Sequence, residues 1–498
     1  MAENVNPDDP GAPKLYHAGT LTYTKSALAI LFFWLLWGDF CYTVMEAVTG
    51  PIMQLKFQKL GASNTEIGVI LGTIPGTLYS ILNPIISYRS DRFRSRWGRR
   101  IPFILFSIPF LVFFLVSLAF GEQVCFWVRD YLGFLFKGIP ANQVTILTLG
   151  ALLVVFTIFN IFGTSTFWFL FNDVTPVHLL ARFMAWIRTI GLLSVAFYSY
   201  VIFPYSGTHS TEIFLGAALL YLVGFGLMCL NVKEGKYPPP SPYIGGKTGT
   251  LAAIRTYATE THAFPHYWYL WICTLIVSIG GGVGAFTLFF QLAIGLNMQQ
   301  IGTLNGTLVL TMGILTIGAG WLADRYHPIR VVLVGFLSSL LIVTPLGLIW
   351  LFWLPPPNVV FWVAMVINIG LAAPSKALGD MWEPPMVMRL FPRSHYGQFS
   401  SVNSVWRAVG SMIGGGLTGA YLDFMTHLVG KERAYFYLPV WSLIFMLPGF
   451  YLFIKLYLSW KKHGGDDAYV APLLLSIQNP VPTAVSPIVP PIENPDRP

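Results

Sequence analysis

The segment SYRSDRFRSRWGRRIPFI at 87–104 carries six arginines and lies between two long apolar stretches. A second segment, GWLADRYHPIR at 320–330, repeats the Asp-Arg pair and again separates two apolar stretches. Short basic loops between apolar runs are typical of membrane proteins, where they record which side of the bilayer a loop occupies. The two segments therefore predict a chain that crosses a membrane many times and contains an internal repeat.

The composition agrees with a chain that lies mostly in lipid. Of its 498 residues 55% are hydrophobic and only 10% are charged, whereas about a quarter of a soluble domain is charged. Apolar runs of about 20 residues, enough for a membrane helix, recur along the whole chain. The net charge of +8 belongs largely to short loops, so it indicates topology and we expect no nucleic-acid partner.

Apolar runs between polar breaks predict twelve membrane helices in two sets of six. The expected spans are 26–52, 65–88, 101–120, 144–170, 184–205, 212–231, 267–292, 299–322, 329–354, 359–388, 399–425 and 434–459. The fold class is thus an all-α membrane protein built from two six-helix pseudo-repeats. The expected domains are an arm at 1–25, a first half at 26–232, a central loop at 233–266, a second half at 267–460 and a disordered Pro-rich tail at 461–498.

The distribution of Lys and Arg predicts the orientation of these spans. The loop at 89–100 and the loop holding Arg325 and Arg330 are strongly basic, whereas the opposite connections carry fewer cations. We therefore expect a multi-pass protein of the plasma (inner) membrane with both termini and the central loop in the cytoplasm, and we expect a monomer.

The quoted loops resemble the two copies of the loop signature of major facilitator transporters. The Ser-Asp-Arg, Ser-Arg-Trp-Gly-Arg-Arg and Pro-Phe elements of 87–104 are similar to those of the glycoside-pentoside-hexuronide cation symporters and the sucrose proton symporters. The resemblance implies a major facilitator fold and secondary active transport. It also implies that spans one, four, seven and ten line a central path.

One position departs from the pattern of the melibiose-type symporters. They have an aspartate that contributes to a sodium site before the proline of span two, whereas this chain has Asn83 before Pro84. A neutral amide lacks the negative charge that a hard cation prefers. We therefore expect the proton, rather than sodium, as the coupling ion.

The loop signature also predicts a conformational latch. Carboxylates and arginines at helix ends can form charge-assisted hydrogen bonds that exist in only one arrangement of the two halves. The alternative is that the arginines only set topology. The expected latch residues are Asp91, Arg92, Arg99, Asp324 and Arg325.

Ionisable residues inside the spans are candidates for function, because each costs about 2.5–3.5 kcal/mol to insert at a helix centre. Asp39 and Glu46 are seven residues apart in span one and so share a helix face. They are the first candidates for proton coupling, followed by Asp380 and Glu383 of span ten. Lys376 and Asp380 could instead form a structural ion pair.

A sugar site combines polar side chains with aromatic rings, since sugars present both hydroxyl groups and apolar C–H faces. The expected substrate-binding residues are Trp34, Trp37, Asn160, Trp168, Gln291, Asn368, Lys376, Trp382, Arg188 and Arg407. An aromatic content of 16% also supplies many lipid-facing rings, so only the whole set supports a sugar.

These patterns predict proton-coupled symport of a small-molecule solute, a sugar or glycoside, by alternating access. The alternatives are an exporter of another organic solute and a non-transporting assembly or sensor protein of the same fold. The sequence contains no recognisable nucleophile and base arrangement, metal-ligand cluster or phosphate loop. We therefore expect neither an enzyme nor a metal or cofactor.

Overall fold

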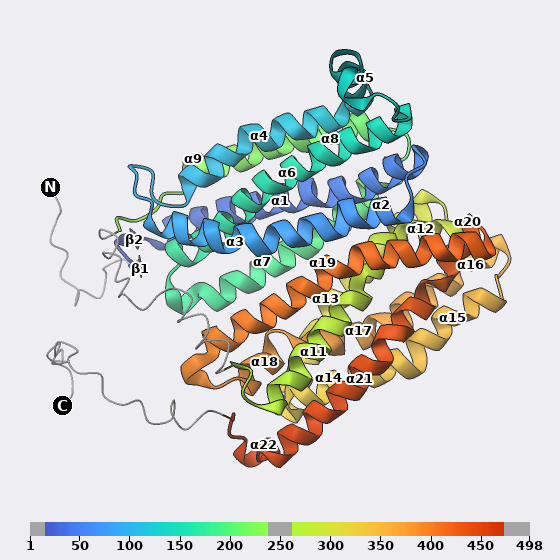
Figure 1. Cartoon of the computed structure of the whole chain (residues 1–498). Coiled ribbons are helices and arrows are strands. Elements are labelled where there is room, and N and C mark those ends of the chain that lie inside the picture. Colours follow the sequence, from blue (N-terminus) through green and yellow to red (C-terminus); the bar gives the residue numbers. More distant parts are fainter. Residues whose placement is uncertain (1–14, 238–260, 473–498) are drawn as a thin grey trace, which may run out of the picture.

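A computed structural model of the chain describes residues 15–237 and 261–472, which form two helical halves (Figure 1). The N-terminal half consists of β1 (Tyr16–Ala18), β2 (Leu21–Tyr23), α1 (Lys25–Lys59), α2 (Asn64–Gly68), η1 (Val69–Thr73), α3 (Ile74–Arg92), α4 (Ile101–Ala119), α5 (Gly121–Leu132), η2 (Gly133–Phe136), α6 (Ala141–Val174), α7 (Val177–Phe197), η3 (Tyr198–Ile202), η4 (Phe203–Tyr205), α8 (Ser210–Leu220), η5 (Tyr221–Phe225) and α9 (Gly226–Asn231).

The C-terminal half follows the same plan without the leading hairpin. It consists of α11 (Pro265–Gly280), η6 (Gly281–Phe286), α12 (Thr287–Ala293), α13 (Met298–Tyr326), α14 (Pro328–Ser338), η7 (Ser339–Val343), α15 (Thr344–Phe352), α16 (Pro357–Met365), η8 (Val366–Ala372), α17 (Ala373–Gly379), η9 (Asp380–Trp382), α18 (Pro385–Leu390), η10 (Arg393–His395), α19 (Tyr396–Val429), α20 (Lys431–Ala434), η11 (Tyr435–Tyr437), α21 (Leu438–Lys462) and α22 (Gly465–Ala468).

The predicted spans are confirmed as helices, with ends that move by up to seven residues. In the described part of the chain, eleven helical segments are long and apolar enough to cross a membrane, and α19 is the twelfth long segment. α19 is less apolar because Gly, Ser and Thr occupy much of its surface, where it packs against α11 and α2 instead of lipid. Span eleven is therefore recognised from its place between neighbours rather than from hydropathy.

Two elements were not predicted. The β1–β2 hairpin lies within the expected arm at 1–25, and the amphipathic helix α5 lies in the connection between spans three and four. α5 buries Cys125 and exposes Phe126 and Trp127, a pattern too short to be read as a span. Most of the expected central loop and of the expected disordered tail lies outside the described residues.

The molecule has two ends, which we name from their loops. The terminal face carries the β1–β2 hairpin, the loop at 93–100 and α22, and the distal face carries the connection at 60–63, α5 and α20 (Figure 1). The halves pack together towards the distal face, where α19 contacts α2 and η1, and α13 contacts η3 and η4. Each contact joins the two halves.

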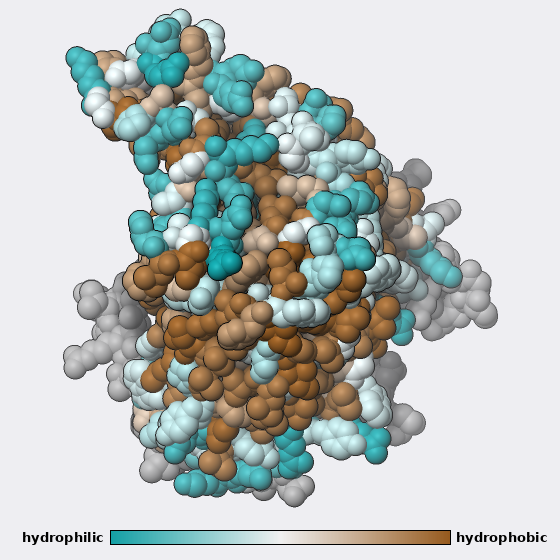
Figure 2. Space-filling view, turned by 90° about the vertical axis from the view of Figure 1, so that its right-hand side faces the viewer, coloured by the Kyte–Doolittle hydropathy of each residue, from teal (hydrophilic) through white to brown (hydrophobic). Residues whose placement is uncertain are grey.

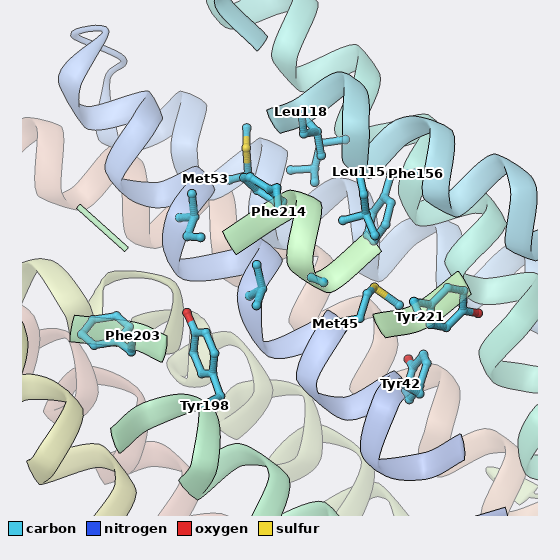
Figure 3. Close-up of a cluster of buried hydrophobic side chains, with 14 of the residues drawn as sticks. Tyr42, Met45, Met53, Leu115, Leu118, Phe156, Tyr198, Phe203, Phe214 and Tyr221 are labelled. Carbon is cyan, nitrogen blue, oxygen red and sulfur yellow. The ribbon is translucent and has the colours of Figure 1, made fainter. Parts of the chain in front are cut away.

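The buried apolar residues form two clusters, and only one of them extends across the two halves. One cluster joins α1, α4 and α8 through side chains such as Met45, Met53 and Phe214, and continues into the other half through Phe289 and Tyr435. In Figure 3 the side chains of Met53 and Phe214 lie together beside α1, whereas Tyr198 and Phe203 lie apart from them. A second cluster lies wholly within the C-terminal half, between Tyr267 and Trp460.

The outer surface is suited to lipid. Ile314, Ile317 and Phe352 expose 72%, 77% and 87% of their surface, and many other large apolar side chains are exposed as well. A soluble protein rarely exposes so large a continuous apolar area. Figure 2 shows a broad apolar area across the middle and lower part of one side, with polar residues gathered above it and at the lower rim. This pattern is typical of a protein whose middle is embedded in a membrane and whose two ends are exposed to water.

Candidate functional site

A cavity of about 390 Å³ lies between the two halves. The N-terminal half contributes Glu46 and Gln54 from α1, and the C-terminal half contributes Gln291 from α12 and Asn305 from α13. Tyr198 of η3 and Phe203 of η4 add aromatic surface on the side of the N-terminal half. The cavity therefore combines one carboxyl group, three amides and two rings.

Glu46 is exposed to this cavity although it lies well inside the first span. The side chains of Tyr42 and Asn160 lie against its carboxyl group, which places Asn160 behind the cavity wall. The hydroxyl groups of Tyr42 and Thr164 are 2.7 Å apart, and Thr164 in turn donates to the backbone carbonyl of Asn160 at 2.7 Å. Glu46 is thus the cavity-facing end of a hydrogen-bonded group that links α1 and α6.

Asp39 lies two turns before Glu46, but it is not part of the cavity lining. It is 3% exposed, and no partner was found for its Oδ2 atom among the described residues. That atom faces α7, 3.7 Å from the position that a Cβ on Gly191 would occupy. The shared helix face is therefore divided: Glu46 opens to the cavity, and Asp39 is enclosed between α1 and α7.

Gln291 and Asn305 form a reciprocal amide pair on the opposite wall. Nε2 of Gln291 donates to Oδ1 of Asn305 at 2.8 Å, and Nδ2 of Asn305 donates to Oε1 of Gln291 at 3.3 Å. The short turn between α12 and α13 brings these two residues together. Asn305 was not predicted, because a single amide in an apolar helix carries no signal of its position until its neighbour is known.

A second cavity of about 500 Å³ adjoins the first. Gln54 and Gly284 line both cavities, and Arg407, Ser278 and Ser411 line only the second. Glycines of η6 and α19 form much of the remaining wall, since the helices approach closely there. Gln54 was not predicted either, because it lies near the end of span one, beyond the expected boundary at 52.

Arg407 reaches the second cavity while paired to a carboxylate. It forms an ion pair with Glu383, which also accepts a hydrogen bond from Nδ2 of Asn403. Thr274 of α11 donates to Oδ1 of Asn403 at 3.0 Å. Glu383 therefore holds together the segments around α11, α18 and α19, and it is not part of either cavity lining.

The other charged candidates lie between the halves. Asp380 and Lys376 are both exposed, and Asp380 interacts electrostatically first with Lys376 and then with Arg188 of the other half. Arg188 is exposed on α7, one turn before Gly191. These three side chains thus form a mixed-charge group that includes both halves, outside the two cavity linings.

The predicted aromatic residues do not gather in one place. Trp37 stacks on Phe40 and lies close to Gly224. Trp382 packs on Phe336 and Phe453. Trp34 is half-buried against the apolar core. Trp168 is 40% exposed beside Phe171. Asn368 donates to the carbonyl of Ala364 in its own helix at 2.9 Å. A role for these five residues in binding stays a prediction.

The loop residues form a network within each half. Asp91 pairs with Arg99 and Arg100, and both arginines also pair with Asp173 at the end of α6. Glu234 accepts hydrogen bonds from the backbone N–H groups of Arg99, Arg100 and Ile101 at 2.9, 2.8 and 2.7 Å. The hydrogen bonds to Asp173 raise the pKa of the Arg99 guanidinium. Asp173 and Glu234 were not predicted, although both are acidic residues at the ends of spans.

The second half has a similar but looser arrangement. Asp324 accepts a hydrogen bond of 2.9 Å from Arg389, and Arg330 pairs with Asp466 after the last span. The guanidinium groups of Arg92 and Arg325 lie over the rings of Tyr88 and Trp321, at 4.5 and 5.4 Å. Acidic residues that follow spans six and twelve thus hold the starts of spans three and nine, as expected of a repeat.

Two helical halves around a shared polar cavity are the arrangement of a membrane solute transporter. The chain belongs to the Major Facilitator Superfamily, whose sequence model matches residues 35–415. It is therefore a multi-pass membrane transporter rather than an enzyme. No curated protein sequence matches the chain significantly.

Solved structures agree on the fold. A bacterial homologue of the human lysosomal transporter Spinster, in an inward-facing and unoccupied conformation, is similar with a TM-score of 0.61 at 15% identity, over 88% of this chain and 99% of that one. The nucleoside transporter NupG is similar with a TM-score of 0.57 at 11% identity, over 85% and 99%. A bacterial homologue of the iron transporter ferroportin has a TM-score of 0.56 at 14% identity, over 86% and 99%. At these identities the similarity shows the fold alone.

Proposed function

We propose that the chain is a proton-coupled symporter of a sugar or glycoside that works by alternating access. The observation that carries this proposal is the position of Glu46, whose carboxyl group faces a cavity lined by amides from both halves. When the two halves open in turn around a fixed site, a carboxyl group between them becomes accessible to protons from one side of the membrane and then from the other. One chain supplies both walls, so a monomer is sufficient.

The coupling step rests on the surroundings of Glu46 and Asp39. The proton affinity of a carboxyl group depends on burial and on its hydrogen bonds, so it changes when a cavity fills with water or with solute. Glu46 has the cavity on one side and Tyr42 and Asn160 on the other. Asp39, enclosed two turns away, interacts electrostatically with Glu46 and is the second proton carrier in this proposal. Asn83 in place of a carboxylate supports a proton rather than sodium.

The solute class rests on the chemistry of the wall. Amide side chains both donate and accept hydrogen bonds, as hydroxyl groups do, and Tyr198 and Phe203 offer surface for C–H faces. A volume of about 390 Å³ lies within the range of about 300–1,000 Å³ for ligand sites. These groups suit a neutral, hydroxyl-rich solute.

The orientation rests on charge. The terminal face carries the basic loop at 89–100 with Arg325 and Arg330, so we place it in the cytoplasm of a plasma (inner) membrane. Since the halves are joined towards the distal face, the structure then corresponds to an inward-facing state. The loop network of Asp91 and Asp324 would act as the latch that forms when the terminal face closes.

Uptake into proteoliposomes tests the function. With an acidic exterior, a panel of labelled mono- and disaccharides should include a sugar that accumulates above its external concentration, and a protonophore should abolish the accumulation. Glu46→Gln should lose accumulation, whereas Glu432→Gln, which changes an exposed glutamate of α20, should keep it.

Two outcomes would contradict the proposal. Sugar uptake that does not depend on the proton gradient and is unchanged in Glu46→Gln would exclude proton coupling. Solute that leaves the vesicles as protons enter would show exchange, and would favour the exporter interpretation instead of symport.

A further inference from the structure

We propose that Asp423 of α19 is the residue that holds the distal face closed, by binding the start of span two in the opposite half. The inference rests on the proposed alternating access, but it concerns residues outside the cavity and outside the basic loops. It assigns to Asp423 the role of a positioning residue that sets the equilibrium between the two open states.

The carboxylate of Asp423 accepts four hydrogen bonds from two residues of the other half. Oδ1 accepts from the backbone N–H of Asn64 at 2.8 Å and from its Nδ2 at 3.0 Å. Oδ2 accepts from the backbone N–H of Thr65 at 2.8 Å and from its hydroxyl at 2.6 Å. Hydrogen bonds to an ionised acceptor are about twice as strong as neutral ones, so this contact is a strong link between the halves.

Span two needs such an acceptor. The first N–H groups of a helix have no partner within the helix. Ser63 caps the N–H of Glu66, and Glu66 in turn accepts from the N–H of Ser63, which leaves the N–H groups of Asn64 and Thr65. Asp423 satisfies both. When the halves separate at this face, these N–H groups and the carboxylate must form hydrogen bonds with water instead.

A further hydrogen bond lies beside the contact between Asp423 and Asn64. The hydroxyl of Tyr435 donates to Oδ1 of Asn64 at 2.8 Å, and Tyr435 and Asn64 are only 3% and 6% exposed. The contact is therefore shielded from water on one side, which strengthens it.

Glycines bring the two backbones close enough for these bonds. A Cβ at Gly419 would lie 2.3 Å from the carbonyl oxygen of Asn64, and a Cβ at Gly415 would lie 2.5 Å from that of Gly68. These distances are far below van der Waals contact, so only glycine fits at either position while the distal face is closed. The same face is joined again between Tyr200 and Thr307, whose hydroxyl groups are 2.7 Å apart.

The charged network of the terminal face differs in kind. In this structure Asp91 and Asp324 bind arginines of their own half, so these contacts do not join the two halves in this state. The bonds of Asp423 exist only while the two halves touch. That is the property required of a latch, and in this structure Asp423 has it.

Thiol labelling tests the inference without any solute. A reporter cysteine at Thr287, which is exposed in the cavity, is treated in sealed vesicles with a membrane-impermeant maleimide from either side. The native Cys41, Cys125, Cys229 and Cys273 are buried. Asp423→Asn should raise the labelling rate from the distal side by roughly tenfold, because it removes an acceptor and the charge from the contact. Thr65→Val should raise it less, and Thr65→Ser should behave like the parent.

Asp466→Asn is the matched control, because it removes a carboxylate that pairs within one half at the other face. It should leave distal labelling unchanged. Unchanged labelling in both Asp423→Asn and Thr65→Val would overturn the proposal, and so would an equal rise in Asp466→Asn. If distal labelling changes as expected but no sugar is taken up, the latch stands and the proposed solute class fails.

Discussion

Asp173 at the end of α6 accepts a hydrogen bond of 2.9 Å from Nε of Arg99, and so ties the end of span four to the start of span three. The same carboxylate also accepts a hydrogen bond of 2.5 Å from Nη2 of Arg99 and one of 3.1 Å from Nε of Arg100. Asp91, which belongs to the recognised loop signature, pairs with the same two arginines from a more exposed position. Two carboxylates thus share two guanidinium groups, with unequal access to water.

Asp173→Ala should destabilise the protein more than Asp91→Ala. The side chain of Asp173 is 10% exposed and that of Asp91 is 51% exposed. Removal of Asp173 should lower the free energy of unfolding by about 1–3 kcal/mol, because buried charged donors lose their acceptor. Removal of Asp91 should cost about 1 kcal/mol or less, as for an exposed ion pair. Thermal unfolding in detergent measures both, and equal losses would contradict the prediction.

Glu46→Gln should separate solute binding from proton coupling. Glutamine keeps the size of the side chain and one acceptor, but it cannot gain and lose a proton at neutral pH. Exchange of labelled for unlabelled solute across the membrane should therefore continue, while accumulation driven by a proton gradient should disappear. Loss of both in a folded variant would show that Glu46 serves binding alone.

Gly419→Ala should keep the distal face from closing. The new methyl group would meet the backbone of Asn64, and overpacking of this kind costs about 1–3 kcal/mol. Alanine is also a better helix former than glycine, so α19 itself should not weaken. Distal labelling of the Thr287 reporter should rise roughly five- to hundredfold. Gly318→Ala, where nothing lies within 4 Å, is the control and should leave the rate unchanged.

The Glu383–Arg407 pair should show non-additive effects on stability. Glu383→Gln leaves the guanidinium of Arg407 without its counter-charge and should cost about 1–3 kcal/mol. The double variant Glu383→Gln with Arg407→Gln should be more stable than the single variant, because no unpaired charge is left. A double variant that loses the sum of both single effects would contradict this pairing.

Acid should weaken the protein through His327, which lies between α13 and α14. Burial, together with nearby Arg389, lowers the pKa of His327 from its ordinary value of 6.5 to about 4. Between these two values the unfolded chain binds a proton that the folded chain does not, so stability is full above about 6.5 and falls as the pH drops towards about 4.

His327→Asn should remove this part of the pH dependence. Asparagine tolerates the positive φ of 67° at this position, and its side-chain oxygen can replace Nδ1 as the acceptor for the N–H of Ile329. Melting temperatures of parent and variant should differ in their slope between about pH 4 and 6.5. Identical slopes would exclude His327 as the cause.

Sequence patterns predicted the helices well because lipid imposes a local requirement. A chain in hydrocarbon must satisfy its own backbone hydrogen bonds, so every span is a run of about 20 apolar residues in helical form. The expected span at 101–120 is observed at Ile101–Ala119, and that at 212–231 lies within the segment Ser210–Asn231. The basic loops are likewise recognisable from short stretches of sequence.

The site could be predicted only in part. Glu46, Gln291 and Arg407 were expected at the path and line the two cavities, whereas Gln54 and Asn305 were missed. An uncharged amide costs less in a span than a charge does, so its presence alone does not mark it as functional. The partners of such residues come from other helices, and no spacing rule within one helix identifies them.

The sequence by itself thus determined a twelve-span transporter in two related halves, since span length, loop charge and repeat are properties of neighbouring residues. The tertiary structure decided which acidic residue faces the cavity between the halves. Helical spacing puts Asp39 and Glu46 on one face of α1, but packing of α7, through Gly191, against α1 encloses Asp39, whereas the space between the halves exposes Glu46. It also brought Asp423 to Thr65, because contacts between helices depend on how their surfaces fit and not on their distance along the chain.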